Sequence, residues 1–220
     1  MLYLLDNDKG VKSHNEFFFR AEDLRCIGHQ YIMQKRASAF DSIALESVSN
    51  YNFSQHINEH RDNYDIFLSH SFSDRALILG LKRKIESMGF SVYIDWIVDK
   101  QLDRSQVSRD TAETLRKRML NSKSLIYAFS DNSSKSLWMP WELGFMDGVK
   151  KQKVAVMQIN ENTNSNRIDY KNQEYLGLYY VVDSMVDREE KVRLWVNSPD
   201  EADKYVEYRE WLNGKEPYKH

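Results

Sequence analysis

The stretch SLWMPWELGF, residues 136–145, places one carboxylate, Glu142, among large apolar side chains. At about 100° per residue, Glu142 falls in the middle of an apolar helical arc made by Trp138, Phe145, Met146 and Val149. A carboxylate normally lies where water reaches it, so one on an apolar face is a candidate for a chemical role. The alternative is an ordinary glutamate in the first turns of a helix, bonded to backbone N–H groups, because Pro140 is tolerated only near a helix start.

Other residues of the chain exclude several familiar chemistries. The segment SHSFSD, residues 69–74, has no glycine with which to cradle a phosphate. No G-x-S-x-G nucleophile elbow occurs, and Asp131 alone matches the acids and lysine that a phospho-receiver needs. The single cysteine, Cys26, allows neither an intramolecular disulfide nor a cysteine-based zinc site, so no metal is expected. His70 is a ligand, a base, a substrate contact or a structural residue.

Composition and charge describe a soluble globular protein. The chain has 220 residues, of which 41% are hydrophobic and 29% are charged, enough for one core-forming domain and an appendage. Its 31 Lys and Arg residues nearly balance its 33 Asp and Glu residues, so nucleic acid is not an expected partner. No apolar run reaches membrane-spanning length, and the start MLYLLDNDKG is too short and too acidic for a secretory signal. We therefore expect a cytoplasmic protein with no membrane partner.

The elements that must position Glu142 alternate between β-rich and amphipathic helical runs. Five runs predict strands, at residues 64–70, 90–97, 124–130, 153–159 and 177–183. Helical runs separate the first four strands, and a closing helix is expected over residues 201–214, with Gly89 and Gly214 at helix ends. This alternation predicts an α/β fold, a flavodoxin-like five-stranded parallel sheet of order 2-1-3-4-5 flanked by helices.

The expected winding also locates a site. Ligands of open parallel sheets bind beyond the carboxyl ends of the strands, where the winding reverses. In the order 2-1-3-4-5 this point lies between the first and third strands, which are followed by residues 69–74 and 130–142. Glu142 is therefore expected next to the place where a ligand binds.

The first sixty residues differ from the rest in their predicted secondary structure, which is mostly helical. Residues 13–49 carry long helix-like stretches with Gly28 as their main breaker, and FFF at residues 17–19 reads most simply as a core face. We predict a helical N-terminal extension over residues 1–60, with an oligomer contact or a cover for the site as its possible roles. The main domain is expected over residues 61–220.

Three motifs in register resemble the Toll/interleukin-1 receptor (TIR) domain family, particularly its stand-alone bacterial members. They are YDIFLSHSFSD at the first strand, GFSVYIDW at the second and SLWMPWELGF after the third. The resemblance covers about residues 62–185, with a C-terminal helix expected to extend to residue 214. It does not include the first sixty residues.

The resemblance implies a chemistry for Glu142. In the family the S-x-W-x-x-x-E-L pattern carries the glutamate of NAD⁺-cleaving members, with the tryptophan four residues earlier lining the pocket, and Glu142 and Trp138 match these positions. As the nicotinamide–ribose bond breaks, the ribose becomes oxocarbenium-like, and a carboxylate stabilises the developing charge. Nicotinamide is already a cationic leaving group, so the resemblance implies no metal, no second acid and no cofactor beyond NAD⁺ as substrate.

The resemblance assigns substrate contacts to five further residues. His70, Ser71 and Phe72 leave the first strand where family members contact the nucleotide, although many members have an aromatic–arginine pair where this chain has His70 and Ser71. Asp95 and Trp96 open the loop that gates the pocket and mediates head-to-tail assembly in the family. Their alternative reading is a solvated connector with Trp96 as a core residue.

The implied function is a TIR-domain NAD⁺ glycohydrolase or cyclase that gives nicotinamide and ADP-ribose or a cyclic ADP-ribose-type signal. The resemblance implies activation by self-assembly, an effector that senses the product, and a role in antiphage defence of the Thoeris type. One alternative is a non-catalytic interaction module that signals by homotypic assembly. Another is an enzyme that cuts a different N-glycosidic bond with the same glutamate.

Overall fold

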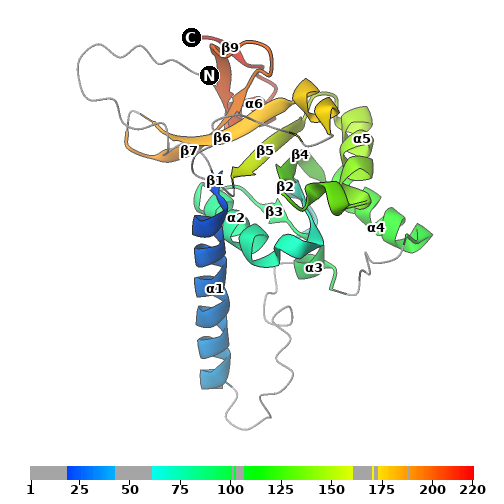
Figure 1. Cartoon of the computed structure of the whole chain (residues 1–220), viewed down its shortest axis with the longest axis vertical. Coiled ribbons are helices and arrows are strands. Elements are labelled where there is room, and N and C mark those ends of the chain that lie inside the picture. The colour runs from blue at the N-terminus through cyan, green and yellow to red at the C-terminus, as the bar shows by residue number, and fades with distance from the viewer. Residues whose placement is uncertain are drawn as a thin grey trace.

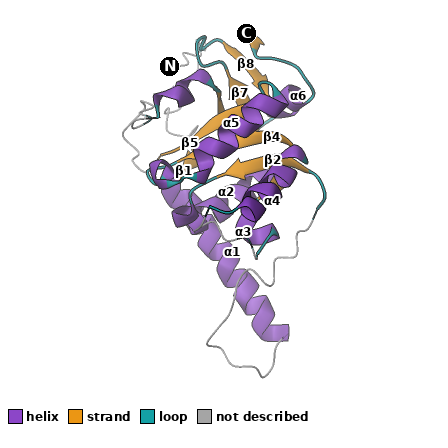
Figure 2. Cartoon of the chain, turned by 90° about the vertical axis from the view of Figure 1, so that its right-hand side faces the viewer, coloured by secondary structure: helices purple, strands orange, loops and turns teal. Residues whose placement is uncertain are grey.

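The computed structural model describes residues 19–42, 61–100, 102, 107–160, 170, 173–187 and 189–220. One twisted sheet runs through this part of the chain, and helices cover both of its faces (Figure 1, Figure 2). The mixed α/β class that the alternating runs predict is confirmed.

Five parallel strands form the centre of the sheet. In chain order they are β2 (Tyr64–Ser69), β3 (Val92–Tyr93), β4 (Ser122–Phe129), β5 (Val154–Asn160) and β6 (Tyr180–Val186). They lie side by side in the order β3-β2-β4-β5-β6, and each neighbouring pair is parallel. Numbered along the chain, this is 2-1-3-4-5. The winding reverses between β2 and β4, so the segments that follow these two strands leave the same edge of the sheet.

The sheet is larger than the predicted five strands. Beyond β6 it continues with three antiparallel strands, β7 (Val192–Asn197), β8 (Lys204–Glu207) and β9 (Tyr218–Lys219). The predicted closing helix over 201–214 is wrong, because its first half is β8 and only the one-turn α6 (Tyr208–Leu212) is helical. In β8 the buried Val206 lies between half-buried neighbours. This two-residue alternation is typical of a strand and not of the predicted helix.

The second predicted strand is also shorter than expected. Only Val92 and Tyr93 pair with β2, and from Asp95 to Val98 the chain forms the single-turn helix α3. Tyr93 and Ile94 are both fully buried, so the run lacks the alternation of a half-exposed strand and continues into the core as a turn of helix.

The helices form two layers. On one face lie α1 (Ala21–Ser42) and α2 (Arg75–Ser87), and on the other lie α4 (Arg109–Leu120) and α5 (Trp138–Lys150) (Figure 1). Gly89 and Gly214 follow the ends of α2 and α6 with φ of 87° and 101°, which confirms both as helix-terminating glycines. Short 3₁₀ turns lie at Phe72–Asp74, Ser133–Lys135 and Glu174–Leu178.

The N-terminal segment packs directly on the sheet. An unpredicted two-residue strand, β1 (Phe19–Arg20), pairs in parallel with β5, and α1 follows it at once. Phe19 is 1% exposed, which confirms a core position for the last residue of FFF, whereas residues 17 and 18 lie outside the described residues. Helices α1 and α2 cross where Gly28 and Gly80 meet the partner helix, because a Cβ on Gly80 would lie 1.8 Å from the Leu24 carbonyl oxygen. The end of α1 extends beyond the body of the protein (Figure 1).

Candidate active site

Glu142 projects from α5 toward the end of β2. The helix begins at Trp138, so Pro140 lies in its first turn as expected, and the backbone N–H of Met139 donates to Ser136 Oγ at 3.3 Å. The Glu142 side chain is fully buried, and its Oε2 accepts a 2.6 Å hydrogen bond from Ser69 Oγ, which is itself fully buried. A buried carboxylate requires such donors, because removal from water penalises its charge. Ser69, the last residue of β2, therefore holds the Glu142 carboxylate in place through this hydrogen bond.

Aromatic and apolar groups surround the carboxylate. Trp138 is 7% exposed and meets Trp141 edge to face at 5.4 Å between ring centroids, while Met139 is fully buried. The predicted apolar arc is narrower than the helical wheel suggested, because Met146 is buried whereas Val149 is 44% exposed. The dry surroundings strengthen electrostatic interactions with Glu142.

Tyr127 adds a second buried hydroxyl near Glu142. It lies on β4 directly opposite Ser69 and donates to Gln173 Oε1 at 3.0 Å. Burial, then Tyr175 and then the negative charge of Glu142 raise the pKa of Tyr127, so it stays an uncharged phenol. The sequence analysis missed Ser69, Tyr127 and Gln173 as site residues. The signal for Ser69 was present, since it is the polar last residue of a buried strand at the winding reversal.

His70 is bound through both ring nitrogens. Its Nδ1 lies 2.8 Å from the Leu68 carbonyl oxygen, and its Nε2 lies 3.1 Å from Trp96 Nε1. A carbonyl can only accept and an indole N–H can only donate, so the geometry assigns the neutral Nδ1–H tautomer. Asp95 Oδ1 lies 3.5 Å from the same Nε2 and forms a charged pair only with the doubly protonated ring. The predicted residues His70, Asp95 and Trp96 thus come together, with His70 linking β2 to α3.

The two segments predicted to meet at the winding reversal do meet. Asp74, after β2, accepts from Ser130 Oγ at 2.6 Å and from Asn132 Nδ2 at 2.7 Å, both after β4. Ser71 is buried at this junction, whereas Phe72 is 57% exposed at its rim. These bonds fix the loops that carry the predicted contacts relative to Glu142.

Helix α3 is anchored at its far end as well. Arg118 of α4 donates to both carboxylate oxygens of Asp99, at 2.7 and 2.8 Å, and Tyr93 Oη donates to Asp99 at 2.8 Å. Burial and the charges of Asp95 and Asp99 raise the pKa of Tyr93, so it remains a donor. Part of the predicted gating loop, residues 101 and 103–106, lies outside the described residues.

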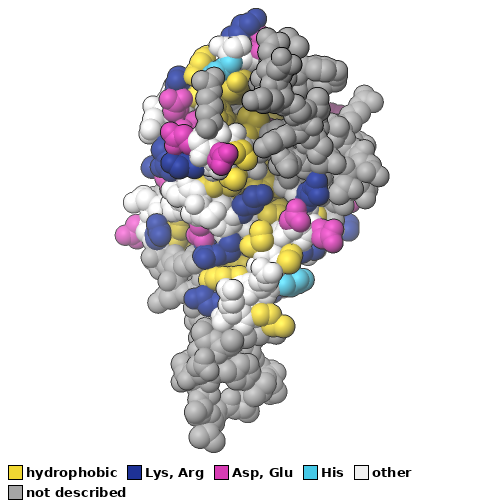
Figure 3. Space-filling model, turned by 90° about the vertical axis from the view of Figure 1, so that its left-hand side faces the viewer, with side chains coloured by type: hydrophobic (Ala, Val, Ile, Leu, Met, Phe, Trp, Pro, Cys, Tyr) yellow, Lys and Arg dark blue, Asp and Glu magenta, His cyan; other side chains and the backbone are white. Residues whose placement is uncertain are grey.

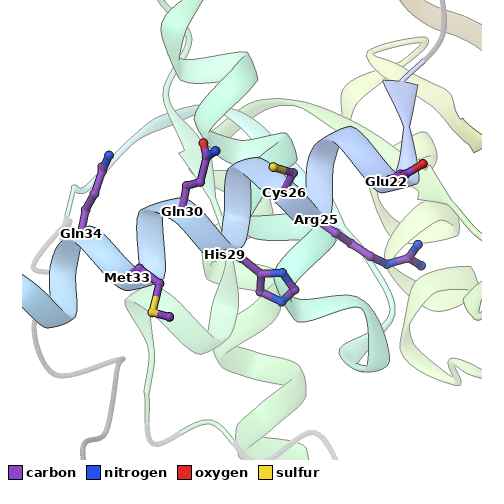
Figure 4. A pocket seen from close by; sticks show the side chains of 7 residues that line it. All are labelled: Glu22, Arg25, Cys26, His29, Gln30, Met33 and Gln34. Atoms are coloured by element: carbon purple, nitrogen blue, oxygen red, sulfur yellow. The ribbon is translucent and has the colours of Figure 1, made fainter.

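The predicted site is closed in this structure. Glu142, His70 and Asp95 are each at most 3% exposed, and Trp138 is 7% exposed, so bulk solvent does not reach the carboxylate. A hollow elsewhere lies along one face of α1, lined by residues that include Arg25, His29 and Met33, and contains none of the predicted site residues (Figure 4).

Two further features bear on the excluded functions. No three His, Cys, Asp or Glu side chains are placed to hold a metal ion within the described ranges, and the pair His56 and His60, with the i, i+4 spacing of two ligands on one helix face, lies outside them. No described helix is long and apolar enough to cross a membrane. Basic and acidic side chains are interspersed on the face shown in Figure 3.

Comparison with known proteins identifies the family. No protein-family model matches the chain. The chain is 53% identical to "Probable 3' cyclic ADP-D-ribose synthase ThsB'" of Bacillus cereus (strain MSX-D12) over 150 residues. These aligned residues make up 68% of this chain and 75% of that protein. It is also 36% identical to "Putative cyclic ADP-D-ribose synthase TIR2" of Cytobacillus dafuensis, over 83 residues that make up 37% of this chain and 22% of that protein. With the three motifs, these relatives show that the chain belongs to the bacterial stand-alone, Thoeris-like TIR proteins.

Proposed function

We propose that this protein cleaves the nicotinamide–ribose bond of NAD⁺ and gives nicotinamide with ADP-ribose or a cyclic ADP-ribose-type product. The observation that carries the proposal is Glu142, a fully buried carboxylate held by Ser69 beside Trp138 at the carboxyl ends of β2 and β4. The names of both relatives support the same reaction class.

The chain's own residues perform two tasks in this reaction. Trp138 offers a ring face to nicotinamide, which leaves as a neutral base with the electron pair of the broken C–N bond. The negative charge of Glu142 stabilises the cation that develops at the ribose carbon, and Ser69 keeps the carboxylate in position. Water or a hydroxyl group of the same ADP-ribose then attacks that carbon and releases a proton. The reaction needs no metal and no cofactor besides its substrate.

The buried setting favours ring closure over hydrolysis. Glu142 is fully buried and Trp138 is 7% exposed, so little water reaches the ribose carbon once the site has closed around the substrate. A hydroxyl group already attached to the ADP-ribose then competes at a high effective concentration. We therefore assign the cyclic compound as the main product.

We infer that self-assembly activates the enzyme by opening the site. Because the free chain covers Glu142, a contact between copies that moves the cover would activate the enzyme. The cyclic product would then bind an effector in antiphage defence. A non-catalytic interaction module has less support, because a buried charge weakens a scaffold that does not use it.

Product analysis tests the proposal. Purified wild-type protein is incubated with NAD⁺, alone and under conditions that promote assembly, and all products are identified by mass spectrometry. We expect nicotinamide release, and Glu142→Gln should lower it at least about 100-fold, the scale for loss of an electrostatic catalytic group. The matched control is Glu113→Gln, a change at an exposed glutamate of α4, which should retain activity. Absence of nicotinamide from every wild-type reaction would refute the proposal and favour the interaction module.

A further inference from the structure

A cationic and aromatic cluster lies at the rim of the closed site. It consists of Phe72, Arg75 and Trp96 and is called the rim cluster below. The Arg75 guanidinium carbon lies 4.0 Å from the centroid of the Phe72 ring and 5.4 Å from that of Trp96. Phe72 is 57% exposed although it is a large aromatic residue, and Arg75 is exposed beside it. The two rings come from different elements, the turn after β2 and α3, and Arg75 bridges them.

The charge of Arg75 has no carboxylate partner among the residues that the structure describes. Within the described ranges no carboxylate forms an ion pair with Arg75, and its partners there are the two rings. Stacking occupies the flat faces of a guanidinium and leaves its N–H groups at the edge, directed away from the rings. The two ring contacts place the guanidinium beside Phe72 and Trp96 without a bound ligand. Planar, bidentate recognition of a phosphate is the use to which such a group is best suited.

A series of contacts connects the rim cluster to the buried carboxylate. The Arg75 guanidinium carbon lies 5.4 Å from the centroid of the Trp96 ring, and the Trp96 indole donates to His70 Nε2 at 3.1 Å. His70 directly follows Ser69, whose hydroxyl holds Glu142 at 2.6 Å. Arg75 therefore lies at the same edge of the sheet as Glu142 and is exposed where Glu142 is buried. A dinucleotide whose ribose reaches Glu142 must carry its phosphates outward past such a rim.

We propose that Arg75 binds the diphosphate of the dinucleotide and that Phe72 and Trp96 hold its guanidinium ready to do so. This inference rests on the proposed function, because it places the nicotinamide ribose at Glu142. It makes Arg75 a binding residue that sets specificity for a nucleotide diphosphate, rather than a group that acts on the reacting bond.

Kinetics with NAD⁺ give the first test. Arg75→Gln should raise KM about 10-fold or more, the scale of one charge-assisted hydrogen bond, while kcat changes less than about 3-fold. Arg75→Lys should give an intermediate loss, because lysine keeps the charge without the planar fork. The matched control is Arg83→Gln on the same helix, since Arg83 also stacks on a ring, that of Tyr31 at 4.5 Å, but on the side of α1. An unchanged KM in Arg75→Gln would overturn the inference.

Binding without turnover gives a second test that does not depend on the reaction. The affinities of ADP and adenosine for wild type and Arg75→Gln are measured by calorimetry. We expect ADP to bind wild type more tightly than adenosine does and the variant to lose that difference. Equal affinities in wild type, or equal losses for both ligands, would refute a diphosphate contact. If ADP binding depends on Arg75 while wild type releases no nicotinamide from NAD⁺, the proposed function fails and the Arg75 site stands.

Discussion

The hydrogen bond from Ser69 to Glu142 makes a quantitative prediction. Ser69→Ala removes a donor 2.6 Å from a carboxylate oxygen, with both side chains fully buried, so no bulk water replaces the hydroxyl. Hydrogen bonds to charged groups contribute about 1.5–3 kcal/mol. At about 1.4 kcal/mol per factor of ten, the loss corresponds to a fall of about 10- to 150-fold in nicotinamide release.

The pH dependence gives a readout that a purely structural serine would not affect. A hydrogen bond to the ionised carboxylate favours that form, so its removal makes protonation easier. The acidic limb of the pH–rate profile should therefore move to higher pH in Ser69→Ala. Rates of nicotinamide release measured from pH 4 to pH 9 in wild type and variant give both the fall in rate and the shift.

A buried serine on the next strand serves as the control. Ser124 of β4 is fully buried, and its hydroxyl donates to the Asp65 carbonyl oxygen at 2.7 Å. The same hydroxyl lies 2.8 Å from Tyr208 Oη, so Ser124→Ala removes two neutral hydrogen bonds. It should lower stability by about 1–3 kcal/mol and leave the pH–rate profile unchanged. If both variants lose stability while Ser69→Ala keeps the wild-type rate and profile, Ser69 does not position Glu142 and the reasoning fails.

Three further changes test other parts of the structure. Gly80→Ala should lower the free energy of unfolding by about 1–3 kcal/mol in thermal melts, because its Cβ would clash with the backbone of α1, whereas Gly148→Ala, with open space around it, should not. Asp183 has its pKa raised by burial to about 7, so the folded state binds its proton more tightly and stability falls as pH rises from about 4 to 7. Asp183→Asn should accordingly raise Tm at pH 8 and change it little near pH 4, and an equal change at both would contradict this. Trp96→Phe removes the donor to His70 Nε2, and amide exchange in α3 should accelerate about 2- to 10-fold; an unchanged rate would show that the bond does not hold α3.

The central part of the fold was predictable because its signals are local. The runs that became β2, β4 and β5 are short and apolar, and the helices between them have a clear 3.6-residue period. The strand pair β7 and β8 was missed although buried Leu194 and Val196 alternate with the half-buried Arg193 and Trp195. The stretch around residues 201–214 also contains good helix formers, and pairing of Val206 with Val196 across the sheet decides against them.

Part of the candidate site was likewise predictable from local sequence signals, and part was not. The helical wheel found Glu142 because the period of one helix needs no knowledge of its neighbours. Its partner Ser69 lies 73 positions away and becomes its neighbour only through the sheet winding and the register of β2 and β4. The width of the apolar arc was overestimated for a related reason. A wheel assigns a face to Val149, but how far the sheet extends beneath α5 decides that it is 44% exposed.

Burial of Glu142 links the site's stability to its activity. A carboxylate removed from water costs several kcal/mol that its partners offset only in part, so a chain selected for folding alone would gain by replacing it. The Ser69 hydroxyl offsets part of this cost, and full burial of the Glu142 side chain leaves the rest uncompensated by bulk water. The same burial separates Glu142 from bulk solvent, so the stability cost and the proposed reaction both depend on one buried carboxylate. The self-assembly that we propose would activate the enzyme only if a contact between copies favoured an open arrangement by at least as much as burial favours the closed one.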